Sequence, residues 1–108
     1  MKRVIDGKLY NTETAEEIAS FCSGQCGDFN FYEAIMYRTK KGALFLYESG
    51  GPFSKMGESN GKESYGTSAL TVLNTDQALS WANENSKELA ASESEAIFTT
   101  CGKKVIEA

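Results

Sequence analysis

The chain has 108 residues, of which 41% are hydrophobic and 24% charged, a composition typical of one globular domain. Eleven Lys and Arg against fifteen Asp and Glu give a net charge of -4, which argues against a protein that coats nucleic acid through its overall charge. The sequence contains no histidine, which excludes Ser-His-Asp and Cys-His catalysis and zinc sites built on imidazole. We expect a single domain over residues 1–108.

The N-terminal segment predicts a β-hairpin followed by a helix. Val4–Tyr10 contains two short apolar runs separated by Asp6-Gly7, a pair of residues typical of tight hairpin turns. Thr14 and Glu17 then have the spacing of a capping box, in which a hydroxyl and a carboxylate satisfy backbone donors. The apolar spacing that follows predicts one buried stripe of an amphipathic helix, made by Ala15, Ile18, Ala19 and Cys22.

The middle of the chain predicts an antiparallel sheet. Phe29–Arg38 alternates between two faces, Thr39–Gly42 is a turn, and Ala43–Glu48 is the return strand. Thr67–Leu73 contains β-branched residues and predicts a further strand. Residues 49–66 contain five glycines and the only proline, so we expect a long glycine-rich loop there.

The C-terminal part predicts a long helix that packs on the sheet. Thr75 is the expected N-cap of a helix from Asp76 to about Ala91, and Ser92–Phe98 predicts a short final helical turn. One face of the long helix is formed by Ala78, Trp81, Ala82, Asn85 and Leu89. The expected fold class is therefore α+β: a small antiparallel sheet of three to five strands with an N-terminal helix and a C-terminal helix.

The cysteines and the apolar runs indicate the cellular compartment in which we expect the protein. Three cysteines, an odd number, are expected to be reduced thiols with structural roles. Cys22 and Cys26 are within reach of one metal ion, but a closed site needs four ligands, and only Cys101 or a carboxylate such as Asp28 would complete it. No secretion signal follows Met1, and no apolar run approaches about 18 residues. We expect a cytoplasmic protein that binds neither metal nor membrane.

The segment Gly57–Lys62 fails as a phosphate-binding P-loop. Three residues separate its two glycines, where four are needed, and Glu63 stands where Ser or Thr must follow the lysine. A thiol enzyme built on one of the first two cysteines stays as an alternative, but it lacks a visible base. We therefore expect no enzymatic activity and no cofactor.

Two surfaces are candidates for partner binding. One combines the Lys40-Lys41 turn with the glycine-rich loop, whose basic and aromatic side chains suit single-stranded nucleic acid or a protein interface. The other is the acidic stretch 76–95, which suits a basic groove on a partner protein. Alternatively, the first surface binds no partner: its aromatic side chains form one face of the core, and its lysines lie in a solvent-exposed turn. The residues predicted to bind a partner are Lys40, Lys41, Phe53, Lys55, Met56, Tyr65, Glu84 and Glu88.

The order of these segments resembles a family of small acidic proteins carried by phages, plasmids and conjugative elements of Gram-positive bacteria. The resemblance covers residues 4–98 and leaves out the Cys22–Cys26 loop and the tail after Phe98. Its motifs are Asp6–Ala15, Phe31–Glu33, Tyr37–Gly42, Phe45–Tyr47, Gly50–Pro52, Ser54-Lys55 and Ala78–Ala82.

Small accessory proteins of this source include anti-CRISPR inhibitors of Cas9. The resemblance thus implies a non-enzymatic inhibitor that binds a bacterial defence nuclease, most plausibly Cas9, as a monomer or weak dimer. Its acidic surface would occupy a basic nucleic-acid groove, or its loop would block a domain motion. The alternative is a nucleic-acid-binding accessory module of the mobile element.

Overall fold

The computed structural model describes residues 1–24, 29–52, 54, 56–59, 61 and 64–106. Over these residues the chain forms an α+β structure, as its patterning predicts. The strands are β1 (Lys2–Ile5), β2 (Lys8–Asn11), β3 (Glu16–Ser23), β4 (Tyr32–Arg38), β5 (Leu44–Gly50), β6 (Glu58–Ser59), β7 (Ser64–Tyr65) and β8 (Thr67–Leu73). The helices are α1 (Thr75–Glu84) and α2 (Ala91–Thr100).

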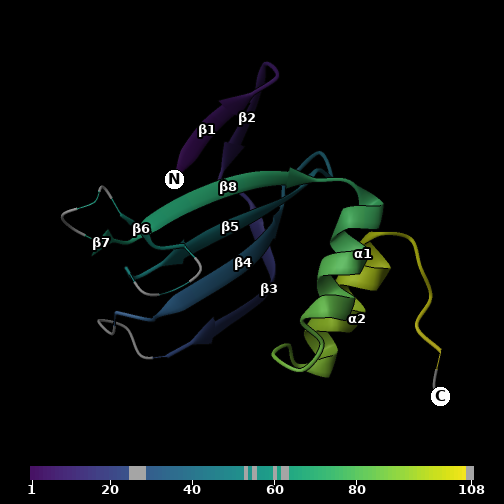
Figure 1. Cartoon of the computed structure of the whole chain (residues 1–108). Helices are drawn as coiled ribbons and strands as arrows, with labels where there is room; N and C mark the ends of the chain where they lie inside the picture. Colours follow the sequence, from purple (N-terminus) through teal and green to yellow (C-terminus); the bar gives the residue numbers. More distant parts are fainter. Residues whose placement is uncertain (25–28, 53, 55, 60, 62–63, 107–108) are drawn as a thin grey trace.

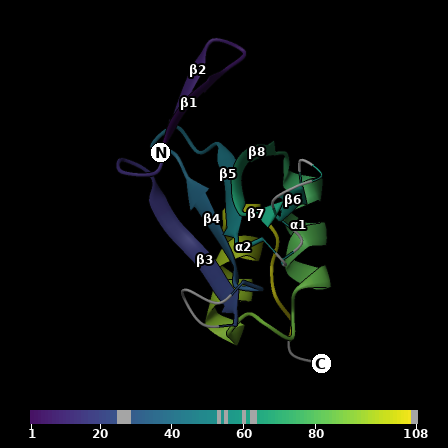
Figure 2. The same ribbon diagram turned by 60° about the vertical axis from the view of Figure 1, so that its left-hand side comes forward.

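Four strands form the main sheet in the order β3-β4-β5-β8, and each neighbouring pair is antiparallel. The strands β1 and β2 form a separate hairpin, and β6 and β7 form a small one within the glycine-rich segment. Figure 1 shows α1 and α2 packed together on one side of the main sheet. Figure 2 shows the β1–β2 hairpin projecting beyond the sheet. The expected antiparallel sheet and C-terminal helix are confirmed.

The face of the main sheet toward the helices carries the larger core. Met36 of β4 and Leu46 of β5 are register partners, and both are buried there. The ring of Phe21 packs against Tyr32 and Trp81, with 5.8 Å between ring centroids in each pair. The buried residues of this helix-face core are Ala19, Tyr32, Ala34, Met36, Leu44, Leu46, Ala78, Ala82, Leu89 and Ile97.

The opposite face carries a smaller core. This hairpin-face core consists of Tyr10, Phe45 and Leu70. Tyr10 of β2 packs edge-on against Phe45, with 5.6 Å between ring centroids, and Tyr37 stacks on Phe45 at 5.2 Å. Ile35 and Tyr47, register partners farther along this face, are only half-buried and belong to neither core. The hairpin therefore closes one end of the face and leaves the other end more exposed.

The turns of the two predicted hairpins are confirmed. Asp6 and Gly7 have φ angles of 53° and 75°, the left-handed conformation that a two-residue hairpin turn requires. Gly42 has a φ of 91° in the turn between β4 and β5. The predicted strand Thr67–Leu73 has the bounds of β8.

The predicted N-terminal helix is wrong. Glu16–Ser23 is strand β3, which pairs with β4, and Thr14 lies in the turn before it rather than at a helix cap. The register shifts between Glu17 and Ala19, so Ile18 and Ala19 both pack on the helix-face core. This bulge turns two successive apolar residues inward and imitates the apolar spacing of a helix.

The predicted long C-terminal helix is shorter than expected, and the predicted short final turn is a full second helix. Asn74, not Thr75, is the N-cap: its side chain accepts from the backbone N–H of Gln77 at 2.8 Å, and the Gln77 side chain accepts from the N–H of Asn74 at 2.8 Å. The helix ends at Glu84, and α2 extends over ten residues instead of one short turn. Leu89 still reaches the helix-face core, as the predicted face requires.

Candidate functional site

The lysine turn and the glycine-rich segment lie at opposite ends of β5. Lys40 and Lys41 precede this strand, and residues 51–66 follow it. The strand has seven residues and is therefore about 20 Å long. The single surface predicted from the turn and the loop is thus two surfaces.

The described part of the glycine-rich segment packs against the rest of the protein. Met56, a predicted partner-binding residue, packs against the helix-face core, and its carbonyl accepts a hydrogen bond from the Thr67 hydroxyl. The hydroxyl of Ser54 donates to the carbonyl of Gly51 at 2.8 Å. A side chain at Gly57 would meet the carbonyl oxygen of Pro52 at 1.9 Å, so this turn requires glycine.

The structure does not place the side chains of the other loop residues that were predicted to bind a partner. Phe53 and Lys55 lie outside the described residues. Tyr65 is described only as part of the backbone of β7, paired with Glu58 of β6. Of the loop residues predicted to bind a partner, the structure therefore places only the Met56 side chain, and that side chain is partly buried.

The lysine turn borders a groove beside the projecting hairpin. The backbone of Thr39 pairs with Ala43, and the Thr39 hydroxyl accepts from the N–H of Ala43 at 3.0 Å, which fixes the turn. The groove has a volume of about 510 Å³. We call it the β2 groove; it is lined by Gly7, Lys8, Leu9, Tyr10, Asn11, Thr14, Ala15, Thr39, Lys40, Lys41 and Ala43.

The β2 groove carries unpaired positive charge. Lys8, Lys40 and Lys41 are exposed, and none of them has an ion-pair partner within the part of the chain that the structure describes. The neighbouring Arg38 differs, because its guanidinium contacts the carboxylate of Glu16 at 2.6 Å. The three free ammonium groups therefore favour an anionic ligand.

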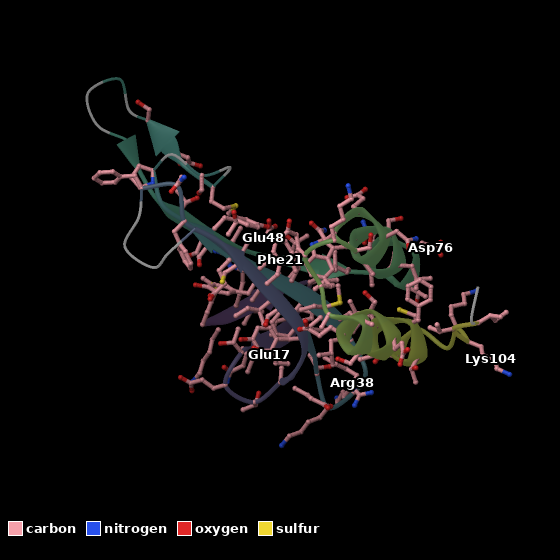
Figure 3. All side chains as sticks on the ribbon, turned by 90° about the horizontal axis from the view of Figure 1, so that it is seen from below. Glu17, Phe21, Arg38, Glu48, Asp76 and Lys104 are labelled. Carbon is pink, nitrogen blue, oxygen red and sulfur yellow. The ribbon has the colours of Figure 1, made fainter. Side chains whose placement is uncertain are left out.

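A shallow acidic groove runs along α1. Asp76 and Glu84 are exposed on this helix, and the half-buried ring of Trp81 lies between them in the groove lining. Glu88, predicted together with Glu84, lies beyond the helix end and outside this lining. Figure 3 shows Asp76 at the helical end of the molecule, away from Glu17 and Arg38 on the sheet. We call this feature the α1 groove.

Tyr32 of β4 and Glu48 of β5 form a polar contact between neighbouring strands. The Tyr32 hydroxyl donates to a carboxylate oxygen of Glu48 at 2.5 Å. Burial, together with this hydrogen bond and the charge of Glu48, raises the pKa of Tyr32 well above its usual range. The contact joins β4 to β5 next to the ring of Phe21, so we assign it a structural role.

The two described cysteines are free thiols on different faces. Cys22 is exposed on β3, and Cys101 packs against the helix-face core, while Cys26 lies outside the described residues. Burial raises the pKa of the Cys101 thiol, and the charge of Lys103 opposes this shift. Within the described ranges, no three Cys, Asp or Glu side chains gather in a group suited to a metal ion.

Sequence reasoning missed three residues that line these grooves. Lys8 and Leu9 were assigned only to a hairpin, and their position opposite Lys40 depends on how that hairpin folds back. Trp81 packs against Phe21 and the helix-face core, as its place on the predicted helix face requires, but it also lines the α1 groove, which the sequence pattern did not predict. The presence of a single tryptophan next to acidic residues was the available signal.

No protein-family model matches the chain, and neither a curated protein nor a solved structure matches it significantly. Across the residues that the structure describes, no helix is both long and apolar enough to cross a membrane.

Proposed function

We propose that this protein is a non-enzymatic inhibitor that binds a bacterial defence nuclease, with Cas9 as the leading target. The α1 groove carries this proposal. A half-buried tryptophan is a favoured anchor in protein interfaces, and exposed carboxylates on either side complement a basic partner surface. The resemblance of the segments to small proteins of mobile elements supports the choice of target.

The mechanism follows from the charge of the target. Cas9-type nucleases hold nucleic acid in a positively charged channel. The carboxylates of Asp76 and Glu84 suit such a channel and would compete there with phosphate groups. The net charge of -4 is modest, so their position beside Trp81 matters more than the total charge. The proposal includes action in the cytoplasm, where the nuclease works, as a monomer or weak dimer.

A cleavage assay with purified Cas9 tests the proposal. We expect inhibition by the parent chain, and Glu84→Lys should raise the half-inhibitory concentration by about tenfold or more. Glu13→Lys makes the same change of charge at an exposed position before β3, and we expect its effect to stay within about twofold. Normal cleavage by several Cas9 orthologues at saturating protein, with no complex on a sizing column, contradicts the proposal.

A further inference from the structure

The β2 groove lies along the outer edge of a strand. Five successive residues, Gly7–Asn11, line it, and none of the residues of β1 does. Side chains of successive strand residues point to opposite faces, so a lining of consecutive residues marks an edge rather than a face. The opposite wall is the turn that carries Lys40 and Lys41.

This edge has backbone groups available for pairing. The turn at Asp6-Gly7 has two residues, so the flanking pair Ile5 and Lys8 exchanges hydrogen bonds across the hairpin. The next pair, Val4 and Leu9, is then a non-hydrogen-bonded pair, and the backbone N–H and C=O of Leu9 point away from β1. A strand edge of this kind is a template for an added strand.

The side chains around the edge select the chemistry of the added strand. Lys8, Lys40 and Lys41 are exposed cations without ion-pair partners in the described ranges. Leu9 is 59% exposed, and it adds an apolar surface next to these charges. The groove therefore fits an extended segment that presents both carboxylates and apolar side chains.

Nucleic acid fits the same groove less well. Binding of single strands without sequence preference depends on bases stacking on exposed aromatic rings. The one ring in the lining is Tyr10, which is 5% exposed and packs against Phe45. A phosphate chain would use the lysines but neither the backbone edge nor Leu9.

We propose that the outer edge of β2 binds an extended acidic segment of a partner protein by strand addition, with Lys8, Lys40 and Lys41 contacting its carboxylates. The site is separate from the α1 groove, and it does not require the partner to be a nuclease. The exposed carboxylates on α1 are helical, and Glu16 at the start of β3 is already paired with Arg38. A second copy that presents Glu17 of its edge strand β3 is therefore one outcome of the test.

Fluorescence anisotropy with a labelled peptide of about nine residues, alternating Glu with Val or Thr, tests the proposal. We expect saturable binding that is at least about tenfold tighter than that of the same peptide with Lys in place of Glu. A thymidine oligonucleotide of about 20 nucleotides should bind more weakly than the acidic peptide. Lys40→Glu combined with Lys41→Glu should weaken peptide binding by about tenfold or more.

Two proline variants test the backbone edge. Leu9→Pro removes the N–H on the β2 side, and Val4→Pro removes the equivalent N–H on the outer edge of β1 in the same residue pair. We expect Leu9→Pro to abolish binding and Val4→Pro to change it by less than about twofold. NMR of the labelled parent chain gives a second measurement that does not depend on variants: peptide addition should shift the Leu9 amide signal and leave that of Val4 in place.

Four outcomes overturn the proposal. They are tighter binding of the oligonucleotide than of the peptide, peptide binding that survives the double lysine reversal, an unchanged Leu9 amide signal at saturating peptide, and a Leu9 signal that moves with protein concentration alone. The first assigns the groove to nucleic acid and the last to a second copy of the chain.

Discussion

The helix-covered face of the main sheet and its hairpin-covered face are closed by different means. Two helices cover the first, and its core contains ten buried residues among those described. The short β1–β2 hairpin covers one end of the second, where the core contains three. Since buried apolar area is the main favourable contribution to folding, the helix face carries most of the stability.

The two faces also differ in their roles: the helix face provides most of the stability, and the hairpin side provides the proposed binding site. The β2 groove is built on the hairpin, which packs on the main sheet through Tyr10, in contact with Phe45, and through the partly buried Ile5. Elements with few buried contacts open at lower free-energy cost than the core does. A partner at the β2 edge therefore meets the part of the molecule that adjusts most easily, while the helix face holds the sheet in place.

The largest expected effect comes from replacing one isoleucine by alanine on each face of the main sheet. Ile97 is fully buried in the helix-face core, and Ile35 is half-buried at the exposed end of the hairpin face. Ile97→Ala should lower the free energy of unfolding by about 3 kcal/mol, and Ile35→Ala by less than about 1 kcal/mol. Urea unfolding of both variants measures the difference. Equal losses would show that the two faces are closed equally well.

Alkaline pH should lower the free energy of unfolding by a smaller amount, through one tyrosine on each face of the main sheet. Burial and Glu48 raise the pKa of Tyr32, while burial, followed by the charges of Glu17 and Glu33, raises that of Tyr37. The unfolded chain releases these protons near pH 10, whereas the folded chain keeps them. The stability that they contribute is therefore complete below about pH 10 and is lost above it, by up to about 1.4 kcal/mol per pH unit for each group.

Unfolding free energies of the parent chain, Tyr32→Phe and Tyr37→Phe from pH 8 upward check this expectation. Tyr32 carries the larger shift, so Tyr32→Phe should flatten the decline more than Tyr37→Phe does. A parent chain whose stability does not fall above pH 10 would contradict both assignments.

The smallest expected effect is on thiol reactivity. In a Cys26→Ser background at pH 8, Cys22 should react with a disulfide reagent at least about threefold faster than Cys101. Cys22 is exposed on β3, whereas Cys101 is partly buried against the helix-face core and burial raises its pKa. Single Cys→Ser variants assign the two rates. Equal rates would mean that the C-terminal end of α2 does not shield its thiol.

Much of the fold follows from local sequence signals. The turn at Asp6-Gly7, the strands around Gly42 and strand β8 were all predictable, because turn chemistry and period-two alternation agree there. Strand β3 was not predictable, because its bulge at Ile18 changes the period of the apolar residues. Only pairing with β4, which is a tertiary contact, decides between strand and helix in that segment.

The candidate sites were predictable only in part. The exposure of Lys40 and Lys41 follows from their place in a turn, and that of Glu84 from its place on a helix. The position of Lys8 beside the turn could not be predicted, since it depends on how the hairpin packs through Tyr10. The roles of these residues in binding stay predictions.

The order of the main sheet has a consequence for how the chain folds. Among the described residues, each pair of neighbouring strands in the main sheet is also successive in the chain, apart from the β6–β7 hairpin inserted between β5 and β8. Because the paired strands are close in the chain, closing the loops between them costs little conformational entropy. Their pairing can therefore begin while the chain is being synthesised. Both helices, however, follow β8. A ribosome-bound chain that ends at β8 therefore exposes Met36 and Leu46, and chaperones have access to this face until α1 and α2 emerge.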